Sequence, residues 1–88
     1  MTTTEFTTDI ESAVDRIDRG LGQLLAGHRS PTTTKAVRIS IAREGEKLYR
    51  RHGRDALVQA AMLIVVRNVD NTRYERSALL QDLWSAIG

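Results

Sequence analysis

Apolar side chains recur at helical spacing through the first third of the chain. The positions are Ile10, Val14, Ile17, Leu21 and Leu24, separated by 4, 3, 4 and 3 residues. This heptad spacing places apolar side chains along one stripe of an α-helix, whereas a strand requires alternation. Thr8 and Glu11 form a T-x-x-E capping box in front of the stripe, and Gly27 follows its end. The pattern predicts a helix over residues 9–25, preceded by a flexible polar tail over residues 1–8.

The segment from 34 to 52 fits a helix better than a strand, after a loop over 27–34 that contains Pro31. A helix places Val37, Ile41, Gly45, Leu48 and Tyr49 on one face and leaves only Ile39 displaced. A strand over 36–42 explains Val37, Ile39 and Ile41 by alternation but accounts for a shorter stretch. We favour the helix, and the strand stays open as the alternative.

A third helix is predicted over residues 55–67, with Asp55 available as its cap. From Ala56 to Val66 the segment is apolar around almost its whole circumference, and Gln59 is its one polar residue. A helix of this kind lies in the middle of a bundle or in an interface with another chain. Its β-branched residues 64–66 also allow a short buried strand.

A turn over residues 69–72 leads to a second capping box, Thr72 and Glu75, and to a fourth helix over 72–87. Together these elements predict an all-α, compact four-helix domain over residues 9–88. The expected core residues are Ile10, Val14, Ile17, Leu21, Leu24, Val37, Ile41, Leu48, Leu57, Ala61, Ile64, Leu80, Leu83, Trp84 and Ile87. Trp84 is expected to pack on the third helix near Leu57, Ala61 or Ile64. Because 88 residues are near the lower limit for one core, we expect a monomer or a homodimer.

Enzymatic chemistry and membrane insertion are not indicated. The chain has no cysteine, and its longest apolar run, residues 60–66, is far below the ~20 residues needed to cross a bilayer. His28 and His52 stand alone and are interpreted as surface or loop histidines. Glu11, Asp15 and Asp18 share the polar face of the first helix, so we interpret them as solvated. The sequence predicts a cytoplasmic, non-enzymatic protein without metal or cofactor.

Charge is sorted into blocks along the chain. Residues 1–25 carry five acidic and two basic side chains, and residues 26–54 carry eight basic and two acidic ones. A net charge of only +2 therefore hides a strongly basic segment. Such a segment meets something negative: an acidic helix of its own chain, an acidic protein surface or nucleic acid.

The basic segment supplies most of the residues predicted to bind a partner. These are Arg43, Lys47, Arg50, Arg51 and Arg54 with Tyr49, joined by Arg73, Tyr74 and Arg76 from the fourth helix. The plainer interpretation is that the basic side chains pair internally, for example with Asp15 and Asp18. Nucleic acid is a less favoured partner, since the acidic first helix repels a duplex. It would be bound by a helix-turn-helix of the last two helices, or by a ribbon-helix-helix strand with Arg38 and Ser40.

The chain resembles a family of small bacterial regulators. The resemblance lies in residues 43–66 (REGEKLYRRHGRDALVQAAMLIVV), the heptad helix in front of them and NTRYERSALLQDLWSAI behind. It is to alpha-proteobacterial quorum-sensing antiactivators of rhizobial integrative elements and conjugative plasmids. The resemblance implies a non-enzymatic helical protein that binds a LuxR-type transcriptional activator or a coactivator and controls horizontal gene transfer. No motif transfers a functional residue to this chain.

Overall fold

The computed structural model describes residues 3–27 and 30–87, and within them every regular element is a helix. The helices are α1 (Thr3–Ala26), α2 (Pro31–His52), α3 (Arg54–Arg67) and α4 (Arg73–Trp84). The predicted all-α four-helix domain is confirmed. The strand alternatives over 36–42 and 64–66 are wrong, because both segments are helical.

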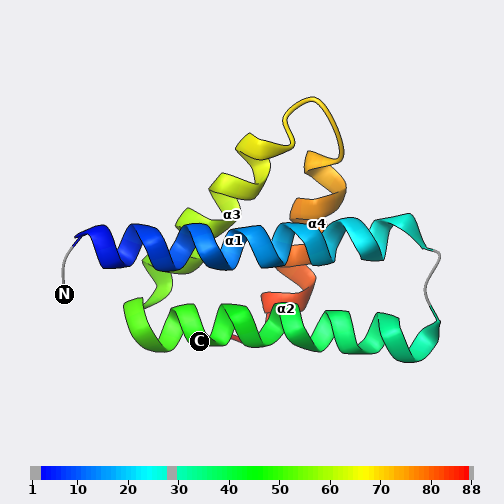
Figure 1. Ribbon diagram of the computed structural model, residues 1–88, viewed down its shortest axis with the longest axis horizontal. Helices are drawn as coiled ribbons and strands as arrows, with labels where there is room; N and C mark the ends of the chain where they lie inside the picture. The colour runs from blue at the N-terminus through cyan, green and yellow to red at the C-terminus, as the bar shows by residue number, and fades with distance from the viewer. Residues whose placement is uncertain (1–2, 28–29, 88) are drawn as a thin grey trace.

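The four helices form two hairpins packed against each other. α1 and α2 run side by side in opposite directions, and the α3–α4 hairpin crosses behind α1 with its turn projecting beyond it (Figure 1). Each helix contacts the other three. The core therefore lies where the two hairpins meet.

Side chains of the α1 heptad stripe fill the centre of this core. Val14, Ile17 and Leu21 have no exposed surface. The expected residues Ile10, Ile41, Leu48, Leu57, Ile64, Leu80 and Trp84 join them in the buried cluster, and Leu24, Val37, Ala61, Leu83 and Ile87 pack partly buried against it. Ala13, Ala56 and Ala60 also belong to the buried cluster.

The start of α1 lies earlier than predicted. Residues 3–8, expected to be a flexible tail, are helical, so Thr8 lies inside the helix and the first capping box is wrong. Phe6 packs against the core and meets His52 edge-on with ring centroids 5.0 Å apart. This tertiary contact with the end of α2 gives the first turns a packing partner, and helices gain most of their stability from such packing. The other end is as predicted: α1 ends at Ala26, and Gly27 has φ +71°.

The remaining helix ends also differ from the prediction. α2 begins at Pro31, because Ser30 Oγ accepts a hydrogen bond from Thr33 N at 3.2 Å and proline suits the first helical position. Residues 31–34 are therefore helical rather than loop. α3 begins at Arg54 after Gly53, whose φ is +82°, so Asp55 lies in the first turn and is not the cap.

α4 spans a shorter segment than expected and lacks its predicted cap. Thr72 makes no side-chain capping bond; its Oγ1 accepts from Arg76 Nε at 2.6 Å instead. The second capping box is therefore wrong, and the helix ends at Trp84 rather than at 87. The predicted turn before it is confirmed.

Trp84 is buried and contacts α2. Its indole Nε1 donates to the Ile41 carbonyl at 3.0 Å. A Cβ added at Gly45 would lie 2.6 Å from Trp84 Cε2 and 2.8 Å from Ile87 Cδ1, so this glycine leaves the space that the indole occupies. Trp84 also lines a groove with Leu57 and Ala61, two of the α3 residues near which it was expected to pack.

Candidate protein-binding surface

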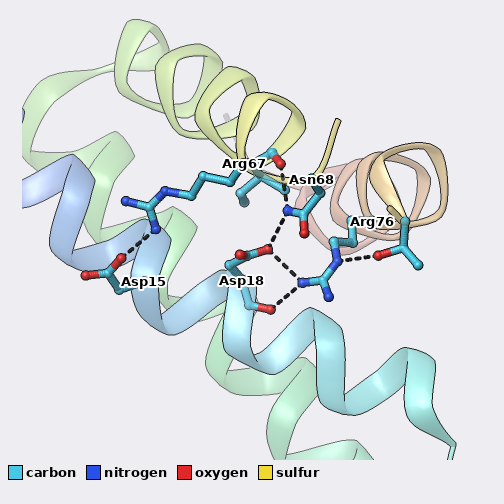
Figure 2. Close-up of polar contacts among 7 residues, drawn as sticks. Asp15, Asp18, Arg67, Asn68 and Arg76 are labelled. Atoms are coloured by element: carbon cyan, nitrogen blue, oxygen red, sulfur yellow. Dashed lines mark hydrogen bonds and ion pairs between the residues drawn. The ribbon is translucent and has the colours of Figure 1, made fainter. Parts of the chain in front are cut away.

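Ion pairs with the acidic side chains of α1 determine which arginine and lysine side chains remain unpaired at the surface. Asp18 Oδ1 accepts from Arg76 Nη1 at 2.7 Å and from Asn68 Nδ2 at 2.9 Å, and its carbonyl accepts from the same guanidinium at 2.7 Å. Asn68 also donates to the Ile64 carbonyl at 2.8 Å. Figure 2 shows this network joining α1 to the ends of α3 and α4. Asp18 is therefore an internal group and not part of a solvated face.

Asp15 lies one turn earlier on α1 and pairs with Arg67 at 2.5 Å (Figure 2). Asp15 is 60% exposed, so this is a surface pair, in contrast to the enclosed Asp18–Arg76 pair. The sequence suggested that both acids neutralise the basic segment. They instead neutralise Arg67 and Arg76, which lie outside it.

Asp9 holds the end of α2 against the start of α1. His52 Nε2 lies 2.9 Å from Asp9 Oδ2, and the His52 side chain is only 2% exposed, so the interpretation of His52 as a surface histidine is wrong. The hydrogen bond with His52 lowers the pKa of Asp9 below its ordinary value of 3.8, burial opposes the shift, and Arg51, 3.4 Å away, adds to it. An ionised carboxylate can only accept, so His52 Nε2 carries the proton. His28 lies outside the described residues.

Arg16 and Glu44 form a further pair between α1 and α2. Arg16 Nε binds one carboxylate oxygen, and Nη2 lies 3.3 Å from the other. The Glu44 side chain is only 11% exposed, and its bond raises the pKa of Arg16 further. Glu44, one of the two acids in the basic segment, is thus neutralised from α1.

Three exposed cations on α2 form no ion pair within the described residues. Arg43, Lys47 and Arg50 are exposed, and none forms an ion pair or hydrogen bond within residues 3–27 and 30–87. Their spacing of 4 and 3 residues aligns them along one stripe. We call these three residues the α2 basic face. Of the other cations predicted in this segment, Arg51 turns toward Asp9 and Arg54 begins α3.

A hollow of about 600 Å³ runs beside the α2 basic face, between α1 and α2. It is lined by Arg16, Ala36, Ile39, Ser40, Arg43, Glu44 and Lys47. Ile39, which the helical pattern left displaced, is 41% exposed here. Ile39 is not among the residues predicted from the sequence to bind a partner. Its position off the apolar face of the predicted helix did indicate that it would be exposed. The hollow offers an apolar contact between cations, which suits an amphipathic segment carrying carboxylates.

The residues predicted at the start of α4 do not join this surface. Arg73 lies 4.6 Å from the Tyr74 ring centroid and donates to its hydroxyl at 2.9 Å. Tyr74 is 71% exposed, whereas the Arg76 side chain is only 14% exposed and bound to Asp18. Tyr49 is 37% exposed on α2. Arg76 is thus fixed inside the fold and cannot reach a partner.

The described residues hold no group of three or more His, Cys, Asp or Glu side chains placed to bind a metal ion. No helix among them has the length and apolar character needed to cross a membrane. No family model, curated protein or solved structure matches the chain.

Proposed function

We propose that this protein is a non-enzymatic cytoplasmic regulator that binds an acidic helical segment of a LuxR-type transcriptional activator and inhibits it. The observation that carries the proposal is the α2 basic face beside the hollow that contains Ile39. These cations form no ion pair within the described part of the chain, while Asp9, Asp15, Asp18 and Glu44 are bound to other side chains. The resemblance to quorum-sensing antiactivators supplies the class of partner.

The geometry suits a helix-in-groove contact. Ile39 can be covered by apolar side chains of a docked helix, while Arg43 and Lys47 at the margin meet its carboxylates. Charges at the rim of an interface mainly accelerate encounter, and the apolar contact slows dissociation. The exposed apolar residues lie mostly on α2 and above all on α3.

Nucleic acid fits the structure less well. The ribbon-helix-helix hypothesis needs a strand over 36–42, and this segment is helical. The helix-turn-helix hypothesis needs Arg73 and Arg76 free on α4, but Arg73 is stacked on Tyr74 and Arg76 is bound to Asp18.

Replacing Arg43, Lys47 and Arg50 together by Ala tests the proposal. We expect binding to a purified LuxR-type activator from the same host to weaken, with association slowed by about tenfold or more and dissociation changed less. A matched variant with Ala at Arg19, Arg38 and Arg73 loses the same charge from other surfaces and should bind almost normally. Surface plasmon resonance at several salt concentrations measures both rates.

The same variants separate protein from nucleic acid as the partner. If duplex DNA were the target, wild-type affinity would fall steeply with salt, and the triple variant would flatten the slope of log K against log salt by ~3. We expect no duplex binding in a gel shift at physiological salt. Salt-sensitive duplex binding that the triple variant abolishes would contradict the antiactivator proposal.

A further inference from the structure

Arg16 lies where two hollows between α1 and α2 meet. The larger hollow, of about 600 Å³, is lined on α2 between residues 36 and 47. A second hollow, of about 260 Å³, is lined on α2 between residues 44 and 51. Arg16, Glu44 and Lys47 line both of them. A segment that binds along the seam between α1 and α2 therefore passes over Arg16.

The guanidinium of Arg16 is bound along one edge only. Nε and Nη2 donate to the two oxygens of the Glu44 carboxylate, whereas Nη1 forms no hydrogen bond or ion pair within residues 3–27 and 30–87. Arginine has five N–H donors, so those of Nη1 remain for a second acceptor. The Arg16 side chain is 55% exposed. Its free edge is therefore open to a ligand, while Glu44 holds the other edge from inside the fold.

Acidic side chains also lie in this region, but those that line the two hollows are already bound. Arg16 binds both oxygens of Glu44, and Asp9, which lines the second hollow, is bound to His52. Glu46, the other acid of the basic segment, lines neither hollow. An incoming carboxylate is therefore not faced by an unpaired acid in either hollow.

We propose that Arg16 anchors a carboxylate of the acidic helical segment and that Glu44 positions Arg16 for this contact, a role that rests on the proposed function. Arg43 and Lys47 line the same hollow and form no ion pair within the described residues, so they add to the attraction. Glu44 fixes the guanidinium before the partner arrives, which reduces the side-chain entropy lost on binding. Arginine is common among the residues that contribute most to binding, and these lie near the centre of an interface.

Arg16→Lys tests the anchor without removing its charge. Lysine has a single nitrogen in place of the planar fork, so it cannot hold Glu44 and a partner carboxylate in the same geometry. We expect dissociation from the purified LuxR-type activator to become about tenfold faster or more, because a charge-assisted hydrogen bond is lost. Association should change less, because the charge that steers the encounter is kept. Surface plasmon resonance measures both rates.

Arg38→Lys is the matched control. Arg38 also pairs with a carboxylate on another helix, Asp82 at 3.3 Å, but it lines neither hollow. The same substitution there should leave association and dissociation at their wild-type rates. Circular dichroism verifies that both variants are folded.

Two substitutions of Glu44 test its positioning role. Glu44→Ala and Glu44→Gln both make the hollow more positive, so association should become faster in both. Gln keeps an oxygen that accepts from Arg16 Nε, so dissociation should stay close to the wild-type rate. Ala leaves Arg16 unheld, so dissociation should become faster. A purely structural role of Glu44 does not predict this division between the two rates.

The outcomes separate this role from the proposed function. A wild type that does not bind the activator overturns both. If the wild type binds and the Arg43, Lys47 and Arg50 triple variant binds more weakly, an Arg16→Lys variant that dissociates at the wild-type rate overturns the role of Arg16 alone. Equal dissociation rates for Glu44→Ala and Glu44→Gln overturn the positioning by Glu44.

Discussion

Asp15 and Asp18 show how two residues of one type, three positions apart on one helix, come to play different roles. Each carboxylate pairs with an arginine. Asp15 and Arg67 are open to water, whereas the Arg76 and Asp18 side chains are only 14% and 22% exposed. Asp18 also accepts a hydrogen bond from Asn68, a buried residue at the end of α3. Removing Asp18 would leave a guanidinium enclosed without its anion, which is far more costly than losing a surface pair.

Asp18→Ala should therefore lower the free energy of unfolding by about 3 kcal/mol. The matched variant Asp15→Ala breaks the exposed pair with Arg67 and should cost less than about 1 kcal/mol. Urea unfolding followed by circular dichroism measures both changes. Equal effects of the two substitutions would show that the Asp18 network does not contribute as its burial implies.

At the scale of the helices, contact between α2 and α4 depends on the absence of one side chain. Glycine inside a helix costs about 1 kcal/mol relative to alanine, so Gly45 weakens α2 locally. It also lets the Trp84 indole approach the α2 backbone and donate to the Ile41 carbonyl. Close approach of the two helices therefore offsets a local weakness in one of them.

Gly45→Ala tests this relation, because helix propensity predicts a rise in the free energy of unfolding and packing predicts a fall. The added Cβ would overlap Trp84 and Ile87, and overpacking in a core costs about 1–3 kcal/mol. We expect the unfolding free energy to fall by about 2 kcal/mol and the Trp84 fluorescence to shift to the red. Gly22→Ala should lower the unfolding free energy less, because its Cβ would lie 3.1 Å from the end of the Arg76 side chain rather than against the Trp84 ring. A Gly45→Ala variant more stable than the wild type would contradict the proposed packing.

At the scale of the whole molecule, the contact between Asp9 and His52 joins the first turns of α1 to the last turn of α2. Because the two helices are antiparallel, these segments meet at the same end of the bundle (Figure 1). The hydrogen bond from His52 lowers the pKa of Asp9 in the folded state. A depressed carboxyl pKa gives stability that is present above the unfolded value near 3.8 and is lost as pH falls through the folded value.

The melting temperature of the wild type should therefore decline as pH falls from roughly 5 toward the folded pKa of Asp9 and below it. Asp9→Asn cannot ionise, so this variant should be less stable near neutral pH and should lose less of its stability on acidification. Thermal unfolding at a series of pH values measures both curves. Parallel curves for the two proteins would contradict a stabilising role of the Asp9 carboxylate.

Local patterns in the sequence determined the four helices and most of the core. The heptad stripe of α1 and the apolar circumference of α3 depend only on helical periodicity, and Gly27 ended α1 as predicted. The Ser30–Pro31 start of α2 is also visible in the sequence as a cap followed by proline, although the predicted helix begins only at residue 34. The early start of α1 was not visible locally, because its first turns gain their stability from Phe6 packing on His52.

Only the tertiary structure decided which charged residues are free. Asp15 and Asp18 lie on the same polar face in the sequence pattern, and Arg76 looks as available as Arg43. The α3–α4 hairpin crosses α1 so that Arg67 and Arg76 take these acids, which leaves Arg43, Lys47 and Arg50 unneutralised. Periodicity fixes which face of a helix a residue occupies, but pairing depends on which faces meet and at what depth, and those contacts join residues more than fifty positions apart.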